Sequence, residues 1–102
     1  MKISLVTVTF NSASTIRTTL RSVANQTWND IEHIIVDGNS VDGTLEIVKE
    51  FKHVNKIISE NDKGIYDAMN KGIMNASGNI IGFLNSDDWF YSDYILEEIA
   101  SE

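Results

Sequence analysis

The feature that most constrains the fold is a regular alternation of short apolar segments and segments with helical periodicity. The apolar segments are rich in β-branched and aromatic residues, which favours strands. They are residues 3–10, 33–37, 55–59 and 79–84. The segments that follow them carry apolar residues on one helical face. They are residues 13–24, 44–51, 65–76 and 93–100. The sequence therefore predicts the order β-α-β-α-β-α-β-α.

The apolar segments read as continuous runs and not as alternating ones, as in "NIIGFL" at residues 79–84. Such runs are typical of strands that are buried on both faces, which points to a parallel sheet with helices on both sides. We therefore expect an α/β fold in a single domain. The first helix has Ser12 or Ser14 available as an N-terminal cap.

Composition excludes several classes of function. The 102 residues carry a net charge of −7, so the chain lacks the basic surface that nucleic-acid binding requires. There is no cysteine, which removes disulfides, thiolate metal sites and a cysteine nucleophile. The N-terminal stretch is too short and too polar for a signal peptide or membrane span, which predicts a cytoplasmic location. His33 and His53 are isolated in the sequence and have no ligand spacing.

Polar residues collect where the predicted strands end. In open α/β sheets, ligands bind outside the carboxyl ends of the strands. The strand over residues 79–84 is followed by Asp87 and Asp88, two adjacent carboxylates that repel each other. A divalent cation shared with a substrate relieves that repulsion, and Mg²⁺ or Mn²⁺ commonly uses one or two carboxylates together with substrate phosphates. The pair is therefore a candidate metal site.

Three stretches in order, "VTVTFN", "VDGNSVDGT" and "GIYDAMNKGIMNASGNIIGFLNSDD", resemble the family-2 glycosyltransferases of the GT-A fold. The resemblance covers essentially the whole chain. It implies a three-layer, Rossmann-like, mostly parallel sheet with strand order 3-2-1-4. It also implies a nucleotide-sugar donor, of which a UDP-sugar is the expected kind.

The resemblance implies which residues contact the nucleotide. Phe10 matches the aromatic residue that flanks the base, with Thr9 and Asn11 in the same loop. Asp37 matches the acid that recognises the uracil edge. Lys63 lies in the loop where relatives place a basic nucleotide contact.

The same resemblance divides the acidic pair, with Asp87 directed toward the ribose and Asp88 toward a metal, Mn²⁺ or Mg²⁺, on the diphosphate. The sequence departs from the family pattern at Gly38, where a second Asp is common, so the base contact rests on Asp37 alone. It also departs at Asn85 and Ser86, which precede the acidic pair where many relatives have Asp-x.

Members of the family are commonly longer than this chain, and their second half supplies the acceptor groove and the general base. We therefore expect residues 1–102 to be the N-terminal, nucleotide-sugar-binding part of a longer enzyme, with the base beyond residue 102 and no activity alone. The intact enzyme is expected to be an inverting transferase of polysaccharide or glycoconjugate synthesis. Its acceptor would be a carbohydrate or lipid-linked molecule, and the enzyme would be cytoplasmic or peripheral at the membrane.

Structural interpretations remain open beside these roles. Phe10 is equally compatible with a core position, Asp37 with a simple Asx turn, and Lys63 with a solvated charge. Asp87 and Asp88 also suit the start of a helix. A receiver-like signalling module or a non-catalytic nucleotide-binding domain is the alternative function, although a receiver needs an acidic pair after its first strand.

The predicted strand over residues 79–84 ends the sheet if no further strand follows. An apolar edge of that kind pairs readily with another chain. We expect it either to form a homodimer or to be covered by the C-terminal helix.

Overall fold

The structure is a computed structural model, and it describes residues 1–101. It contains four strands and four helices in strict alternation. These are β1 (Ile3–Thr9), α1 (Ile16–Ala24), β2 (Ile31–Asp37), α2 (Thr44–Val48), β3 (Val54–Ser59), α3 (Ile65–Met74), β4 (Ile80–Phe83) and α4 (Ile95–Ala100). The order predicted from the apolar segments is confirmed, and each element begins or ends within a few residues of its predicted bounds.

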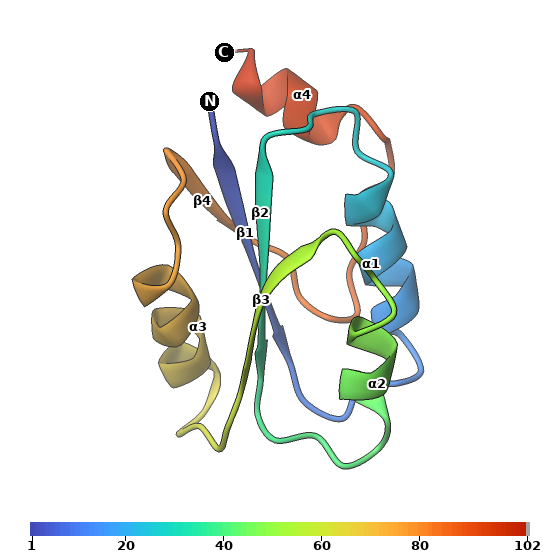
Figure 1. Cartoon of the computed structure of the whole chain (residues 1–102), viewed down its shortest axis with the longest axis vertical. Coiled ribbons are helices and arrows are strands. Elements are labelled where there is room, and N and C mark those ends of the chain that lie inside the picture. Colours follow the sequence, from blue (N-terminus) through green and yellow to red (C-terminus); the bar gives the residue numbers. More distant parts are fainter. Residues whose placement is uncertain (102) are drawn as a thin grey trace.

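The four strands form one parallel sheet with the order β3-β2-β1-β4. Helix α3 lies on one face of the sheet, whereas α1 and α2 lie on the other (Figure 1). The three-layer arrangement and the strand order agree with the GT-A nucleotide-binding half. In a parallel sheet all carboxyl ends meet at one edge, so the polar residues that follow the strands are brought together there.

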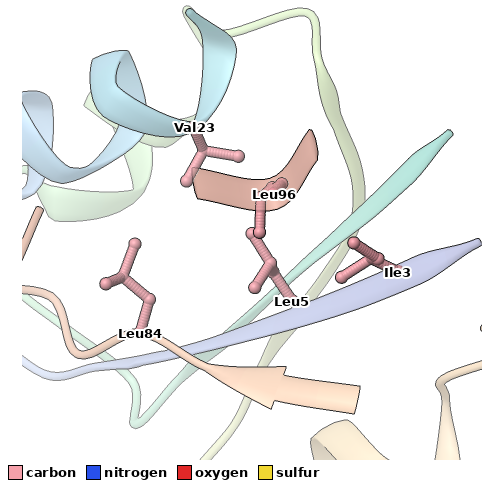
Figure 2. Close-up of a cluster of buried hydrophobic side chains, with 5 residues drawn as sticks. All are labelled: Ile3, Leu5, Val23, Leu84 and Leu96. Atoms are coloured by element: carbon pink, nitrogen blue, oxygen red, sulfur yellow. The ribbon is translucent and has the colours of Figure 1, made fainter. Parts of the chain in front are cut away.

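Apolar side chains fill both spaces between the sheet and its helices. On the α1 side, Figure 2 shows Ile3 and Leu5 of β1 packed with Val23 of α1, Leu84 and Leu96 of α4. On the α3 side, Val6, Ile34 and Val36 pack against Ala68. Helix α3 approaches closely here because Gly72 has no side chain, and a Cβ at that position would lie 2.3 Å from Val6 Cγ1. The central strands are therefore buried on both faces, as predicted.

Strand β4 does not follow the prediction of burial on both faces. Ile81 and Phe83 are 39% and 42% exposed, and exposure alternates along the strand. The physical reason is position: β4 is an edge strand, and α3 lies over β1 and β2 rather than over β4. Helix α4 packs on the α1 side through Leu96, so it leaves the outer edge of β4 open.

The start of α1 also differs from the prediction. Its N-cap residue is Thr15, which makes no side-chain capping bond, so neither Ser12 nor Ser14 caps the helix with its hydroxyl. The backbone carbonyl of Ser12 instead accepts the N–H groups of Thr15 and Ile16. The Ser12 hydroxyl is thereby left for a contact with a distant loop, which is described below.

Folding brings together the two histidines that are isolated in the sequence. The rings of His33 and His53 stack with centroids 5.2 Å apart, and His33 Nδ1 lies 3.0 Å from His53 Nε2. His33 Nε2 lies 2.8 Å from Thr7 Oγ1. Burial, together with the neighbouring His53, lowers the pKa of His33 to about 3, so its ring is neutral at physiological pH. The pair lies on the amino-terminal half of the sheet.

One buried carboxylate organises the amino-terminal edge of the sheet. Glu32 accepts hydrogen bonds from the Ser4 hydroxyl at 2.9 Å and the Ser77 backbone N–H at 2.8 Å, and Lys56 Nζ lies 3.3 Å away. Burial raises the pKa of Glu32, but the bonds from Ser77, Ser4 and Lys56 outweigh it and lower the pKa to about 2. The charged carboxylate therefore ties the turn between α3 and β4 to β1 and β2.

Glu32→Gln should remove part of the dependence of stability on pH. Because the folded pKa of Glu32 is depressed, its contribution is fully present above the unfolded value of 4.5 and is lost as pH falls toward 2. We expect the parent to exceed the variant in free energy of unfolding at pH 6, with the difference shrinking between pH 4.5 and 2. Urea denaturation across that range measures it, and a constant difference would contradict the assignment.

Candidate functional site

Three loops converge at the carboxyl edge of the sheet, at the lower end of the molecule in Figure 1. The loop after β1 is tied to the loop after β2, because the Asn11 N–H donates to Ser40 Oγ at 2.8 Å and Asn11 Oδ1 accepts the Val41 N–H at 2.9 Å. Asn39 Nδ2 donates in turn to Asn61 Oδ1 in the loop after β3, at 3.2 Å. Asn11 and Asn39 adopt φ values of 48° and 69°, a left-handed conformation that asparagine tolerates. These loops therefore form one connected surface.

A hollow of about 280 Å³ lies where the loops after β1 and β3 meet. It is lined by Val8, Thr9, Phe10, Asp62, Gly64 and Ile65. Phe10 is 61% exposed, so it does not occupy a core position. Thr9 is 1% exposed, and its hydroxyl oxygen has no hydrogen-bond partner among residues 1–101. An aromatic ring and an unpaired buried hydroxyl at one hollow are features that a planar polar ligand would match.

A second hollow, of about 320 Å³, opens at the amino-terminal end of the sheet beside Trp28 and His53. It is slightly larger, but it lies away from the strand ends at which α/β sheets bind ligands. Trp28 Nε1 and the two histidines already have hydrogen-bond partners within the chain. We therefore place the candidate site at the carboxyl edge.

Asp37 lies at this edge but is turned inward. It is fully buried, and its oxygens accept the Ser40 backbone N–H at 2.8 Å, the Ser40 hydroxyl at 2.5 Å and the Ser59 hydroxyl at 3.0 Å. The bond to the Ser40 N–H is the Asx turn considered from the sequence. In this structure Asp37 braces the loop after β2 and joins it to the end of β3.

Two lysines near the end of β3 behave differently: Lys63 lies in the loop after β3 and Lys71 lies in α3. Lys63 is exposed, and its backbone N–H donates to Asp67 Oδ2 at 2.9 Å, which holds the start of α3. Lys71 reaches back to the Asn61 carbonyl at 3.0 Å and to Glu60 at 3.1 Å. Lys71 therefore shapes this loop, whereas the Lys63 side chain extends toward solvent.

The loop that carries Asp87 and Asp88 is held against α1 by a row of hydroxyl groups. Ser12 Oγ lies 2.8 Å from Ser86 Oγ, and Thr15 Oγ1 donates to the Ser86 carbonyl at 3.0 Å. Thr19 Oγ1 reaches both the Ser86 carbonyl at 3.0 Å and the Asp88 carbonyl at 2.5 Å. The backbone of the acidic loop is thus fixed by α1.

The same polar face of α1 continues toward α4. The Phe90 N–H donates to Ser22 Oγ at 3.1 Å, Gln26 Nε2 donates to the Ser92 carbonyl at 2.8 Å, and Gln26 Oε1 accepts the Leu96 N–H at 3.1 Å. We did not identify this stripe from the sequence, although its signal is present. Ser12, Thr15, Thr19, Ser22 and Gln26 follow one another at spacings of three and four residues, the spacing of one helical face. Thr19 and Ser22 lie in α1, and the other three lie just beyond its ends.

The side chains of Asp87 and Asp88 are exposed and free. Within residues 1–101, no hydrogen bond or ion pair uses their carboxylate oxygens, and only the backbone of Asp88 is engaged. No group of three or more acidic, histidine or cysteine residues suited to a metal is found in the same part of the chain. The protein thus offers two carboxylates on a fixed backbone, and a bound metal would need further oxygen ligands from its substrate.

The comparison with known families decides the assignment. The model of the family described as "Glycosyl transferase family 2" matches residues 4–101. The chain belongs to glycosyl transferase family 2. This assignment excludes the receiver-like module. In addition, the chain after β1 continues with Phe10 and Asn11 and not with the acidic pair that a receiver needs.

Curated relatives of this family-2 chain are considerably longer than it is. EpsH of Bacillus subtilis (strain 168) is 39% identical over 95 residues, which cover 90% of this chain and 28% of EpsH. A PGL/p-HBAD biosynthesis glycosyltransferase of Mycobacterium bovis (strain BCG / Pasteur 1173P2) is 37% identical over 102 residues, covering 96% of this chain and 40% of the relative. The chain therefore spans less than half the length of these relatives.

Solved structures share the fold of the family-2 chain. S. aureus TarS 1-349 in complex with UDP-GlcNAc superposes with a TM-score of 0.92 at 30% identity, covering 99% of this chain and 30% of that one. The mannosyltransferase PcManGT of Pyrobaculum calidifontis, in complex with GDP-Man and Mn²⁺, gives a TM-score of 0.84 at 22% identity, covering 90% of this chain and 29% of that one. The second likeness establishes the fold alone. Across residues 1–101, the helices lack the length and apolar character that a membrane span requires.

Thr19→Val should loosen the acidic loop. Valine has nearly the same shape, but it leaves the Asp88 carbonyl without its hydroxyl donor and the Ser86 carbonyl with the Thr15 hydroxyl alone. The loss of these part-buried bonds should cost about 0.5–1.5 kcal/mol. Thr18→Val is the matched control, because Thr18 is exposed on the same helix. Urea denaturation and amide exchange of residues 86–90 measure the effect. Equal stability and equal exchange in the two variants would contradict the role of the hydroxyl row.

Proposed function

We propose that this chain binds the nucleoside diphosphate of a sugar donor at the carboxyl edge of its sheet. UDP is the proposed nucleotide, in keeping with the UDP-GlcNAc complex of TarS, a relative by structure at 30% identity. The chain is the donor-binding part of a transferase that moves the sugar onto an acceptor hydroxyl.

One observation supports this proposal: the loop that carries Phe10 contacts the loop that carries Asp87 and Asp88. Phe10 offers an exposed ring beside the hollow that contains the unpaired Thr9 hydroxyl. Two residues further on, Ser12 contacts the loop of Asp87 and Asp88 through Ser86. An aromatic platform thus lies one short loop away from a pair of free carboxylates, the arrangement that a nucleoside diphosphate with a divalent metal requires.

The acidic pair fits a divalent metal. Its carboxylate oxygens are exposed and unpaired within residues 1–101, and hard cations such as Mg²⁺ and Mn²⁺ prefer such oxygens. We assign Asp88 to the metal and Asp87 to the ribose hydroxyls. The metal, when bound, would neutralise the charge that grows on the diphosphate as it leaves. The residues of this chain hold and orient the donor, with Lys63 as an additional basic contact.

The proposed reaction inverts the anomeric centre by direct displacement. It needs a general base to remove the proton of the acceptor hydroxyl, and we assign no residue of this chain to that role. We expect the base and the acceptor groove to come from a region that the longer relatives possess, so that this chain alone binds donor without transferring sugar. We propose a carbohydrate or lipid-linked acceptor, in polysaccharide or glycoconjugate synthesis, and a cytoplasmic reaction that is peripheral at the membrane for a lipid-linked acceptor.

Asp88→Asn should abolish the metal-dependent part of UDP binding and leave the fold intact. Loss of one charged oxygen ligand should cost at least about 1.5–3 kcal/mol, by analogy with hydrogen bonds to charged groups. Asp93→Asn is the control, since Asp93 is an exposed acid further along the same loop. Calorimetric titration with UDP, with and without Mn²⁺, measures the effect. Manganese-dependent binding of equal strength in Asp88→Asn and the parent would overturn the assignment.

The outer edge of β4 is the proposed contact between two copies of this chain. The N–H of Ile80 bonds to Lys2, just before β1, and that of Leu84 bonds to Val6 of β1. The backbone groups of Ile81 and Phe83 therefore face outward, as alternate residues of a parallel strand do. The side chains of Ile81 and Phe83 are partly exposed, and Ile73 of α3 is 43% exposed. Helix α4 does not cover this edge, so it is free to pair with a second chain.

A Phe83→Lys variant should weaken this self-association. Lysine on an edge strand opposes pairing by its charge and its solvation. Sedimentation equilibrium at increasing concentration should show dimers for the parent and monomers for Phe83→Lys. Tyr66→Lys, at a side chain that is 79% exposed on α3, is the control for added charge. A parent that stays monomeric at high concentration would contradict the homodimer.

A further inference from the structure

The hydrogen bonds of Asp37 argue against its expected role as the residue that contacts the nucleotide base. Asp37 is that residue by resemblance, but its two oxygens already accept three hydrogen bonds, and its side chain is fully buried. Turning it toward a ligand would leave the Ser40 N–H and the hydroxyls of Ser40 and Ser59 without their partner, which is unfavourable. Asp37 is therefore a positioning residue for the loop after β2.

A second carboxylate lies at the hollow and has a free oxygen. Asp62 Oδ1 accepts the Gly64 N–H at 3.1 Å, whereas Oδ2 takes part in no hydrogen bond or ion pair within residues 1–101. Asp62 lines the hollow together with Thr9 and Phe10. Its free oxygen lies beside the Phe10 ring, because Asp62 Oδ2 and Phe10 Cδ1 both lie within 3.4 Å of the position that a Cβ at Gly38 would occupy.

Gly38 makes room for this carboxylate. A Cβ at Gly38 would lie 2.9 Å from Asp62 Oδ2 and 3.4 Å from Phe10 Cδ1. A side chain there would push Asp62 away from the hollow or shift the ring. Asp62 can therefore occupy this position only because residue 38 is a glycine and not a second acid.

The hydrogen-bonding capacity of these groups is specific. A carboxylate can only accept, while a threonine hydroxyl can donate or accept. Uracil presents a ring N–H between two carbonyl oxygens, which suits an acceptor beside a donor. Cytosine and adenine present a ring nitrogen with a lone pair at the corresponding position, which a carboxylate repels.

We propose that Asp62 determines base specificity by accepting the ring N–H of uracil, with the Thr9 hydroxyl donating to a neighbouring carbonyl oxygen and Phe10 stacking on the ring. This inference rests on the proposed function, because it presupposes that a uridine nucleotide binds at the carboxyl edge. It replaces Asp37 by Asp62 as the residue that contacts the base.

The test compares UDP, CDP and UDP methylated at the uracil ring nitrogen, all with Mn²⁺, by calorimetry. Asp62→Asn retains an oxygen for the Gly64 N–H but places an amide N–H₂ group toward the base. UDP affinity should fall by about ten- to a hundred-fold, the range of a hydrogen bond to a charged group. The ratio of CDP to UDP affinity should rise, because the amide can donate to the cytosine ring nitrogen. Methylated UDP should bind the parent and the variant equally weakly.

Glu60→Gln is the matched control, since Glu60 is an acid of the same loop that does not line the hollow and pairs with Lys71. It should leave the ratio of UDP to methylated UDP unchanged. An equal loss of both ligands in Asp62→Asn would assign Asp62 to loop structure alone and overturn the inference, as would unchanged UDP affinity.

The two proposals fail in different ways. If the parent binds none of these nucleotides with Mn²⁺, the proposed function fails and the inference fails with it. If the parent binds UDP and loses affinity in Asp88→Asn but not in Asp62→Asn, the proposed function stands and the role of Asp62 is refuted.

Discussion

The rest of the structure depends on the central position of β1. This strand pairs with β2 along one side and with β4 along the other, so it joins the two parts of the sheet. Its middle residue Val6 packs under Gly72 of α3, and the Val6 carbonyl accepts the Leu84 N–H where β4 ends. Its carboxyl end delivers Thr9 and Phe10 to the site. A shift of β1 would therefore move the candidate base site and the acidic loop together.

Polar contacts position the acidic loop, and apolar packing secures its two ends and Phe90. Leu84 and Leu96 are buried in the same core cluster, but the chain between them follows the hydroxyl and amide groups of α1. Hydrogen bonds are directional, whereas apolar burial is not. A row of side chains that donate to backbone carbonyls can therefore set the path of a loop whose own side chains, Asp87 and Asp88, stay free for a ligand.

The acids of the carboxyl edge differ in what their oxygens already contact. Asp37 accepts three hydrogen bonds from Ser40 and Ser59 and braces the loop after β2. Asp62 has one committed oxygen and one free oxygen. Asp87 and Asp88 keep all their carboxylate oxygens free within residues 1–101. The same chemical group thus acts as a structural element or as a potential ligand contact according to its hydrogen bonds.

The sequence by itself determined the order of elements, the parallel sheet and the edge at which polar residues gather, because apolar periodicity is a local property of the chain. It also indicated the family, through ordered motifs such as the one that ends in Asp87 and Asp88. Only the tertiary structure decided that β4 is half exposed, that Asp37 is turned inward and that Asp62 lies beside Phe10. These facts depend on contacts between loops that are distant in sequence, and periodicity carries no information about which oxygen is already bonded.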